Sequence, residues 1–467
     1  MPAMRTCGPL AAATLFLAAC GGGGEDAPPS ERGNVLAASL AAQVSTAQID
    51  AGTAASGLQA LSGPAACNVD VRYVLYTTRD PKGAQATASA GVLVPSGSGS
   101  QCSGERPVLL YAHGTTTSRA KNMADVRNDK EASLLMAMYA AQGYIVVAPN
   151  YLGYEKSSLA WHPYLNAKAQ AVDMVDGLRA AKTHLKDAKS GSTASSQLFI
   201  AGYSQGGHVA LATQREIQTE HAGEFSVTAA AGMSGPYNLS GFARVVNAPA
   251  SEGGRVNAGA LLFTPMLLTS YQNSYGNVYA KASDAYREPY AKTIEALLPS
   301  DEALESLLDD TRLPKDPTLT RLFGEGGLLT DSFRQDFLTN ENNGFRKALV
   351  ANDLTSFKPS RPVALCGGSQ DPTVFYSINT GAMQAQINEG RPVQAQVPAF
   401  DLENRATLPP GTAVDLMAQK FADNKAALAA AGGPTEVAKQ YHGSLVPPFC
   451  NALVRAFFQQ VAQQPGL

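Results

Sequence analysis

The sequence predicts an α/β protein with a doubly wound, mostly parallel sheet of eight strands and one helical insertion. Two observations lead to this prediction. Apolar runs such as 108–110 and 145–147 are continuous, which is typical of strands that a parallel sheet buries on both faces. These runs alternate with helical patterns, and strand–helix alternation favours a parallel sheet with right-handed crossovers.

The expected elements follow from apolar runs, helical periodicity and turn residues along the chain. The eight expected strands are 69–76, 88–94, 107–112, 144–149, 197–202, 227–233, 362–366 and 392–397. Helices are expected near 131–142, 167–186, 205–219 and 376–389, and a further helical segment is expected at 412–431.

The alternation stops between two strands, where residues 236–359 are mostly helical in pattern and contain no convincing strand. An insertion at this place predicts a cap over the carboxyl edge of the sheet, where ligand sites of α/β proteins form. Tyr271, Tyr275 and Tyr279 recur at every fourth position and are expected on one helix face. They would either line an ester pocket or pack the core of the cap, and packing is the favoured alternative.

The composition is that of a globular protein. The chain has 467 residues, of which 45% are hydrophobic and 16% charged, and its formal net charge is −3 from 36 basic and 39 acidic residues. We expect no nucleic-acid partner, because a protein that binds nucleic acid normally needs a basic face.

We expect the chain to divide into a signal peptide (1–20), a tether and N-terminal segment (21–66), and a core in two parts (67–235 and 360–467) around the cap (236–359).

The first twenty residues are typical of an export signal. Arg5 precedes an apolar run, 9–19, which is too short to span a membrane and fits a secretory signal. The run ends in Leu17-Ala18-Ala19-Cys20, which resembles the bacterial lipobox and implies a lipid on Cys20 after cleavage. Gly21 then implies the outer membrane, with a polar tether over 21–32 and the lipid as the only membrane contact. An ordinary signal peptide, giving a periplasmic or secreted protein, is the alternative.

Export also decides how the remaining cysteines are interpreted. Four cysteines in an oxidising compartment predict two disulfides, with three possible connectivities, and buried free thiols are the alternative. Cys67 and Cys102 bracket two adjacent strands, whereas Cys366 ends a strand and Cys450 opens the last helix. We therefore expect the pairs Cys67–Cys102 and Cys366–Cys450. We expect no metal site, because their spacing is not that of metal ligands.

A nucleophile is predicted at Ser204. Residues 199–201 lead into Gly202-Tyr203-Ser204-Gln205-Gly206-Gly207, a G-x-S-x-G motif between a strand and a helix. A sharp turn there exposes the serine hydroxyl, and Gly202 and Gly206 lack the Cβ atoms that would collide. The helix N-terminus favours a developing oxyanion. A glycine-rich turn without chemistry is the alternative interpretation.

An oxyanion hole needs a second N–H group, which normally comes from the loop after the third core strand. That strand ends in His113-Gly114-Thr115, whose His-Gly step predicts a tight backbone turn beside the nucleophile. The N–H groups of Thr115 and Gln205 are the expected donors. We expect His113 to fix this loop by hydrogen bonds rather than to act as a base.

A serine nucleophile needs a histidine base oriented by a carboxylate, in the chain order serine, acid, histidine for a sheet of this kind. His442, in a loop between the last strand and the final helix, is the expected base. His221, at the far end of the nucleophile helix, is the alternative. His208 is expected to pack beneath the turn, and His162 either lines the pocket or is structural.

The expected acid is Asp371. It lies in Gly367-Gly368-Ser369-Gln370-Asp371-Pro372, on the loop that follows the strand 362–366, from which it can reach the segment that carries the histidine. Asp353 and Asp401 are the alternatives, and each is less well placed.

The chain resembles the α/β-hydrolase superfamily, and more narrowly its secretory-lipase-like esterases, from about residue 69 to its end. The matching pieces are His113-Gly114-Thr115, Asn150-Tyr151-Leu152-Gly153, the motif around Ser204, residues 368–371 and His442. The resemblance implies that Ser204, Asp371 and His442 form a triad that hydrolyses carboxylic esters without a metal or organic cofactor. The chain departs from the pattern in two places. Asn150 stands where these sequences often carry Asp, and the helical segment 412–431 separates the last strand from His442.

The leading hypothesis is therefore an envelope-anchored serine esterase or lipase that acts through an acyl-enzyme. A serine peptidase is the nearest alternative, because the same triad attacks amides, although peptidases of this fold usually carry a propeller or a larger lid. A non-catalytic binding protein is the third, and the intact triad argues against it. The natural substrate, whether a glyceride, an aromatic ester or a polyester, depends on how the cap packs, which the sequence does not determine.

Overall fold

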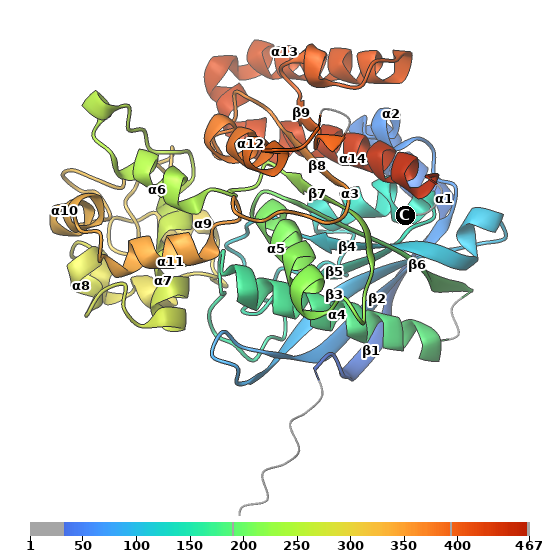
Figure 1. Ribbon diagram of the computed structural model, residues 1–467, viewed down its shortest axis with the longest axis horizontal. Helices are drawn as coiled ribbons and strands as arrows, with labels where there is room; N and C mark the ends of the chain where they lie inside the picture. Colours follow the sequence, from blue (N-terminus) through green and yellow to red (C-terminus); the bar gives the residue numbers. More distant parts are fainter. Residues whose placement is uncertain (1–31, 189–190, 393–394, 465–467) are drawn as a thin grey trace, which may run out of the picture.

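The computed structural model describes residues 32–188, 191–392 and 395–464. Its centre is a nine-stranded sheet of order β1-β2-β3-β5-β4-β6-β7-β8-β9 (Figure 1). The pairs from β1 to β5 are antiparallel and all later pairs are parallel, so the sheet is mostly parallel, as the sequence predicts. The strands are β1 Val35–Val44, β2 Asn68–Arg79, β3 Gln85–Ser96, β4 Gly104–Ala112, β5 Ile145–Pro149, β6 Ser192–Tyr203, β7 Val227–Met233, β8 Val363–Gly367 and β9 Ala399–Asp401.

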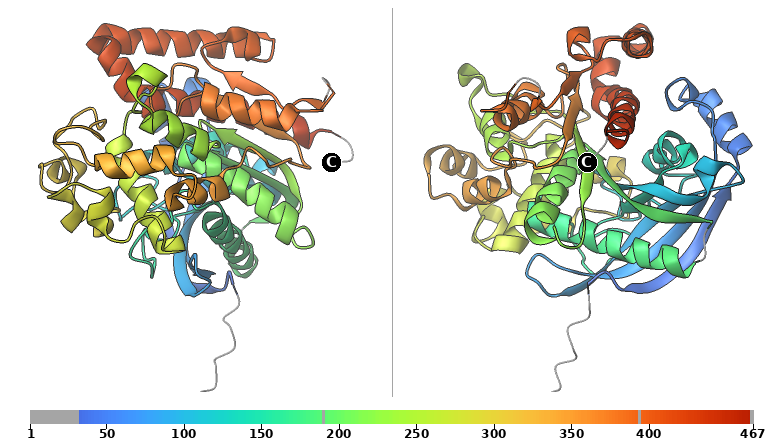
Figure 2. Two further views of the ribbon diagram at one scale, coloured as in Figure 1. Left: turned by 60° about the vertical axis from the view of Figure 1, so that its left-hand side comes forward. Right: turned by 45° about the vertical axis from the view of Figure 1, so that its right-hand side comes forward.

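Helices cover both faces of this sheet (Figures 1 and 2). These helices are α1 Thr46–Ser56, α2 Gln59–Ser62, α3 Lys130–Met138, α4 Ala167–Asp187, α5 Gln205–Glu220, α12 Ala382–Asn388, α13 Thr412–Gln440 and α14 Val446–Ala462. Leu109 and Tyr111 of β4 join one core with α3 and α14, whereas Val108 and Leu110 join a second core with α4, α5 and α12. Alternate residues of one strand thus serve opposite faces, and the apolar run is continuous because both faces are buried.

Strand β1 was not expected from the sequence. It pairs antiparallel with β2 at the edge of the sheet, so the expected number of eight strands was wrong. Most of its residues are exposed, and an alanine-rich strand with two exposed faces shows neither alternation nor strong strand propensity. The segment 21–66 therefore contributes a strand to the sheet, while most of the expected tether, 21–31, lies outside the described residues.

The last strand was expected too early in the chain. The first seven expected strands overlap β2 to β8, but β9 lies at Ala399–Asp401 rather than at 392–397. The Ala395 N–H donates to the carbonyl of Pro392, and the Val397 N–H donates to the Asn388 side chain. These backbone groups bond locally and do not join the ladder, which starts where Ala399 pairs with Leu365 of β8.

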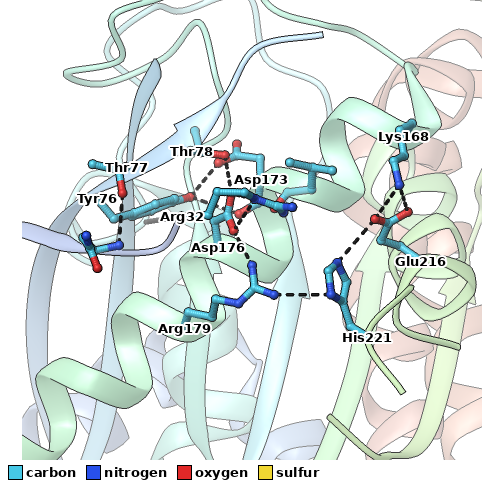
Figure 3. Close-up of polar contacts among 12 residues, drawn as sticks. Arg32, Tyr76, Thr77, Thr78, Lys168, Asp173, Asp176, Arg179, Glu216 and His221 are labelled. Atoms are coloured by element: carbon cyan, nitrogen blue, oxygen red, sulfur yellow. Dashed lines mark hydrogen bonds and ion pairs between the residues drawn. The ribbon is translucent and has the colours of Figure 1, made fainter. Parts of the chain in front are cut away.

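Buried ion pairs tie the chain before β1 to α4 (Figure 3). The carboxylate of Asp176 is buried and contacts Arg32 at 3.0 Å and Arg179 at 2.7 Å. The Thr78 hydroxyl donates to the same carboxylate at 2.8 Å. Because a buried carboxylate is costly without such partners, the contacts of Asp176 with Arg32 and Thr78 fix the segment before β1 against α4 and β2.

The insertion between β7 and β8 forms a separate helical layer, the cap (Figure 1). Its helices are α6 Leu239–Asn247, α7 Ala260–Tyr275, α8 Ala282–Ala285, α9 Leu304–Leu307, α10 Asp331–Thr339 and α11 Gly344–Asn352. The cap has a hydrophobic core of its own, which includes Leu261, Leu268 and Phe345. The cap is thus helical, as expected, and its own core holds it together.

The three tyrosines of the cap do not share one helix face. Helix α7 ends at Tyr275, because Gly276 has a left-handed φ of 72°, and Tyr279 lies beyond the helix. Tyr271 is buried in the cap core and donates to the Leu165 carbonyl at 3.1 Å. The expectation of a shared face was wrong, and the favoured packing role holds for Tyr271.

The C-terminal helices differ from the expected loop. Helix α13 runs beyond 412–431 to Gln440, with a break at Gly432 and Gly433. It continues into a π-helical turn, Tyr441–Leu445, which leads directly into α14. His442 therefore lies in a helical turn rather than in a loop, and π turns are frequent at functional sites.

Two disulfides connect the cysteines as expected. Cys67 pairs with Cys102, and Cys366 of β8 pairs with Cys450 of α14, with Cα–Cα distances of 5.4 Å and 5.6 Å. The expected signal peptide, with its lipid site Cys20, lies outside the described residues. Where the chain is described, each helix is too short or too polar to cross a membrane.

We predict that peptide mapping under non-reducing conditions recovers Cys67 with Cys102 and Cys366 with Cys450. Replacing Cys366 and Cys450 together by Ala should lower the free energy of unfolding by up to about 4 kcal/mol, since this disulfide closes an 84-residue separation. Denaturant unfolding of this variant beside a matched Cys67/Cys102 variant measures the effect. A peptide that links Cys67 to Cys366 or to Cys450 would contradict the connectivity.

Candidate active site

Ser204 lies on a strained turn between β6 and α5. Its backbone has φ 59° and ψ −123°, values that a residue with a Cβ atom rarely adopts. A Cβ atom on Gly202 would lie 2.1 Å from the carbonyl oxygen of Gly206, and one on Gly206 would lie 1.9 Å from that of Ala112. The turn therefore exists only because both positions are glycine, as the motif predicts.

Ser204, His442 and Asp371 form one chain of hydrogen bonds. The Ser204 hydroxyl donates to His442 Nε2 across 2.7 Å, and His442 Nδ1–H donates to Asp371 Oδ2 across 2.6 Å. The structure thus brings together three residues that the sequence places up to 238 positions apart. A base next to a hydroxyl, itself oriented by a carboxylate, is the arrangement that activates a serine.

The Asp371 carboxylate is buried and held from both sides. Its Oδ1 atom accepts hydrogen bonds from the N–H groups of Thr373 at 2.8 Å and Val374 at 3.1 Å, which leaves Oδ2 for His442. The alternatives bond elsewhere. Asp353 accepts from Ser240 on α6, and Asp401 accepts from the backbone N–H groups of residues 369 and 403.

Two further contacts position His442. Its carbonyl accepts a hydrogen bond from the Tyr203 hydroxyl at 2.6 Å, and the two rings lie 5.2 Å apart. The Cys366–Cys450 disulfide joins the strand before Asp371 to the helix after His442. Asp371 and His442, which come from distant parts of the chain, are thereby held on one scaffold.

The loop after β4 lies beside Ser204, as expected for an oxyanion loop. A Cβ atom on Gly114 would lie 3.7 Å from that of Ser204. The Gly114 N–H donates to Glu131 at the start of α3 across 3.0 Å, and the Tyr111 hydroxyl donates to the same carboxylate at 3.2 Å. The Thr115 hydroxyl bonds to the Tyr164 hydroxyl at 2.9 Å. This loop is therefore fixed by Glu131 from the core side and by Tyr164 from the segment between β5 and α4.

The other histidines near the site are held by the protein. His113 is buried between the carbonyls of Gly114 and Asn150, and burial lowers its pKa. His208 is buried beneath the turn and bonds to the carbonyl of Asn352 at 2.8 Å, and burial lowers its pKa to about 4. Both occupy the structural positions that the sequence predicts.

His221 lies away from Ser204, at the end of α5. It contacts Glu216 at 3.4 Å and Arg179 at 3.3 Å, in the polar network of Figure 3. The structure therefore places this alternative base in a surface network and not beside the serine.

Asn150 is buried, and its side-chain amide both accepts and donates a hydrogen bond. Its Oδ1 atom accepts from the Met123 N–H at 2.7 Å, and its Nδ2 group donates to the Ser89 hydroxyl at 2.9 Å. An ionised aspartate accepts hydrogen bonds but cannot donate, so this position is suited to asparagine here.

A pocket between the cap and the edge of the sheet includes Ser204 and Gln205 in its wall. Most of its lining is apolar and comes from the cap, including Leu239, Phe242, Phe263, Leu267, Phe333 and Leu349. Tyr271, Tyr275 and Tyr279 are not among its lining residues. The pocket therefore places the polar Ser204 and Gln205 beside mostly apolar walls.

Sequence reasoning missed several residues that hold the site. Glu131 and Tyr203 hold the site through contacts with distant segments of the chain, and no local sequence pattern marks these contacts. The contact of the Gln205 side chain with His162 was missed as well, although the place of Gln205 directly after Ser204 was a usable signal. Glu131 and Tyr203 are found only because the fold brings distant segments together.

Comparisons with known proteins bear on the family and the fold of the chain. A model of the prolyl oligopeptidase family matches residues 130–231, which include the turn at Ser204. No curated protein matches the sequence. Candida antarctica lipase A is 14% identical with a TM-score of 0.53, covering 79% of this chain and 76% of that one, and it shows the fold alone.

Closer similarity is found to a rice cell wall degrading esterase, LipA, from Xanthomonas oryzae. One structure of it is 32% identical, covers 79% of this chain and 91% of its own, and has a TM-score of 0.69. A ligand-bound form is 30% identical, covers 91% and 98% of the two chains, and has a TM-score of 0.74. With this identity over nearly the whole relative, the chain belongs to the family of LipA-like esterases and hydrolases within the α/β-hydrolase superfamily.

Proposed function

We propose that this protein is a carboxylic ester hydrolase in which Ser204 is the nucleophile, His442 the base and Asp371 the orienting acid. The observation that carries the proposal is the continuous hydrogen-bond chain from the Ser204 hydroxyl through both His442 nitrogens to Asp371. Its geometry provides the proton path that an acyl transfer needs.

The reaction follows from these positions. His442 Nε2 takes the hydroxyl proton as Ser204 Oγ attacks the ester carbonyl, and the buried Asp371 carboxylate stabilises the imidazolium that forms. The N–H groups of Thr115 and Gln205 are the proposed donors to the oxyanion. His442 returns the proton to the leaving alcohol, which leaves an acyl-enzyme. Water attacks that ester by the same route, releasing the acid and restoring the Ser204 hydroxyl.

The pocket favours a substrate with an apolar group. Phenylalanine and leucine side chains of the cap surround the space beside Ser204, so an aliphatic or aromatic group bound there loses its contact with water. The Xanthomonas relatives are described as rice cell wall degrading esterases, so esters of plant cell walls are one substrate class to test.

A peptidase is the second candidate function, because the prolyl oligopeptidase model matches the segment around Ser204. We predict that the purified protein hydrolyses nitrophenyl esters and that its rate on a peptide anilide is negligible beside its rate on the esters.

Ser204→Ala should lower ester kcat by at least about 10⁴-fold while the circular dichroism spectrum stays unchanged. A Ser204→Ala preparation with the turnover of the wild type would refute the proposed nucleophile, and faster anilide cleavage would favour the peptidase.

The base is tested by comparing histidines. His442→Ala should lose about as much activity as Ser204→Ala, because the two residues act as one unit. His221→Ala should retain most of the activity, since His221 contacts Glu216 and Arg179 rather than Ser204. An active His442→Ala variant together with an inactive His221→Ala variant would show that the base is the wrong histidine.

We propose that the mature protein is anchored to the outer membrane of a bacterial envelope through a lipid on Cys20. The support is the sequence Leu17-Ala18-Ala19-Cys20 after an apolar run. In a bacterial host, wild-type protein should fractionate with membranes and incorporate labelled palmitate, and Cys20→Ser should do neither. Labelling of the Cys20→Ser variant, or no labelling of the wild type, would contradict lipidation.

A further inference from the structure

His162 lies between Leu152 and Gln205, and each of its two ring nitrogens contacts one of these residues. The side chain is buried, in the segment between β5 and α4. Its Nδ1 atom lies 2.7 Å from the carbonyl oxygen of Leu152, and its Nε2 atom lies 2.6 Å from Nε2 of Gln205. Both distances are those of strong hydrogen bonds.

These partners determine the tautomer of His162. The Leu152 carbonyl can only accept, so Nδ1 carries the hydrogen, and Nε2 then accepts from the Gln205 amide. Burial lowers the pKa of His162 to about 3, so the ring stays neutral near neutral pH. The Gln170 amide, 3.4 Å from Nε2, is a second and longer contact. The imidazole therefore donates to the Leu152 carbonyl and accepts from the Gln205 side chain, and so bridges two segments of the chain.

The Leu152 end of this bridge is itself anchored. The Leu152 N–H donates to Oδ2 of Asp173 at 2.9 Å, and Oδ1 of Asp173 accepts from the Tyr76 hydroxyl at 2.9 Å (Figure 3). The peptide around Leu152 is thus held at its N–H by α4 and at its carbonyl by His162. The Tyr154 ring packs against the imidazole at 4.7 Å. His162 consequently has little freedom to move, which a positioning role requires.

The Gln205 end lies at the reacting centre. Gln205 directly follows Ser204 and is the first residue of α5, and its N–H is a proposed oxyanion donor. Its side chain is buried, and within the described residues its Oε1 atom has no hydrogen-bond partner. A buried amide with an unpaired oxygen costs stability, so an apolar side chain would suit this place better if only stability mattered. What the amide provides is the bond to His162.

We propose that His162 is a positioning residue of the active site. It holds the Gln205 side chain, and through it the peptide whose N–H faces the oxyanion, so that the oxyanion hole is formed before substrate binds. This inference rests on the proposed function. His162 does not touch the reacting atoms and carries no proton in the reaction.

Two substitutions separate the two bonds of His162. The amide of glutamine reaches the place of Nε2, so His162→Gln keeps an acceptor for Gln205 but loses the bond to Leu152. The shorter asparagine places its amide near Nδ1, so His162→Asn keeps the bond to Leu152 but loses Gln205. Both variants keep a buried polar group and lose one hydrogen bond each, so their thermal midpoints should fall by similar amounts.

The expected result is a difference in turnover that stability does not explain. For nitrophenyl esters, His162→Asn should lower kcat between about tenfold and a hundredfold with KM within about twofold, whereas His162→Gln stays within about threefold of the wild type. A trifluoromethyl ketone, which forms a tetrahedral adduct with the serine, should bind His162→Asn more weakly by the same factor. Gln205→Met should resemble His162→Asn, and the double variant should be no worse than either.

Each outcome supports or overturns the inference. Wild-type kcat in His162→Asn, or equal losses in the asparagine and glutamine variants, would show that His162 is only structural. Additive losses in the double variant would show that it does not act through Gln205. Failure of the proposed function is distinguishable, since the wild type would then lack esterase activity or Ser204→Ala would retain it.

Discussion

The backbone conformation at Ser204 is the constraint on which the rest of the site depends. A non-glycine residue at φ 59° costs about 1–3 kcal/mol and persists only where its surroundings hold it. Here β6 is paired on both sides, by β4 and β7, and the Ser204 N–H donates to the Met233 carbonyl at 2.8 Å. The turn thus lies at the centre of the sheet, where neighbouring strands on both sides hold β6 in place.

Asp371 and His442 lie far from Ser204 in the sequence, and each is fixed by hydrogen bonds in which backbone groups take part. The N–H groups of Thr373 and Val374 orient Asp371, and the Tyr203 hydroxyl binds the carbonyl of His442. Side chains held in this way lose little further freedom when a substrate binds. Preorganisation of this kind lets hydrogen bonds stabilise charge in the transition state without first reorganising.

The sequence was sufficient for the features that depend on local pattern. Strand-like runs, continuous and apolar in the central strands, located β2 to β8, and the glycines around Ser204 predicted the turn. Strand β1 was missed because both of its faces are exposed, and β9 was misplaced because the backbone of the preceding turn bonds to itself. Contacts such as Glu131 with Gly114 depend on the packing of α3 against the sheet, and no spacing in the chain encodes them.

The two layers of the molecule divide the work of recognition and reaction. The polar groups that contact Ser204 belong to the sheet, its loops and the helical turn before α14, whereas the apolar walls beside it come mainly from the cap, which has its own hydrophobic core. A substitution in the cap can change the shape of the pocket while β6, α5 and their hydrogen bonds stay in place. Because the cap is one insertion between β7 and β8, its sequence can diverge without disturbing the strained turn. Members of such a family can therefore differ in substrate while they share one arrangement of serine, histidine and aspartate.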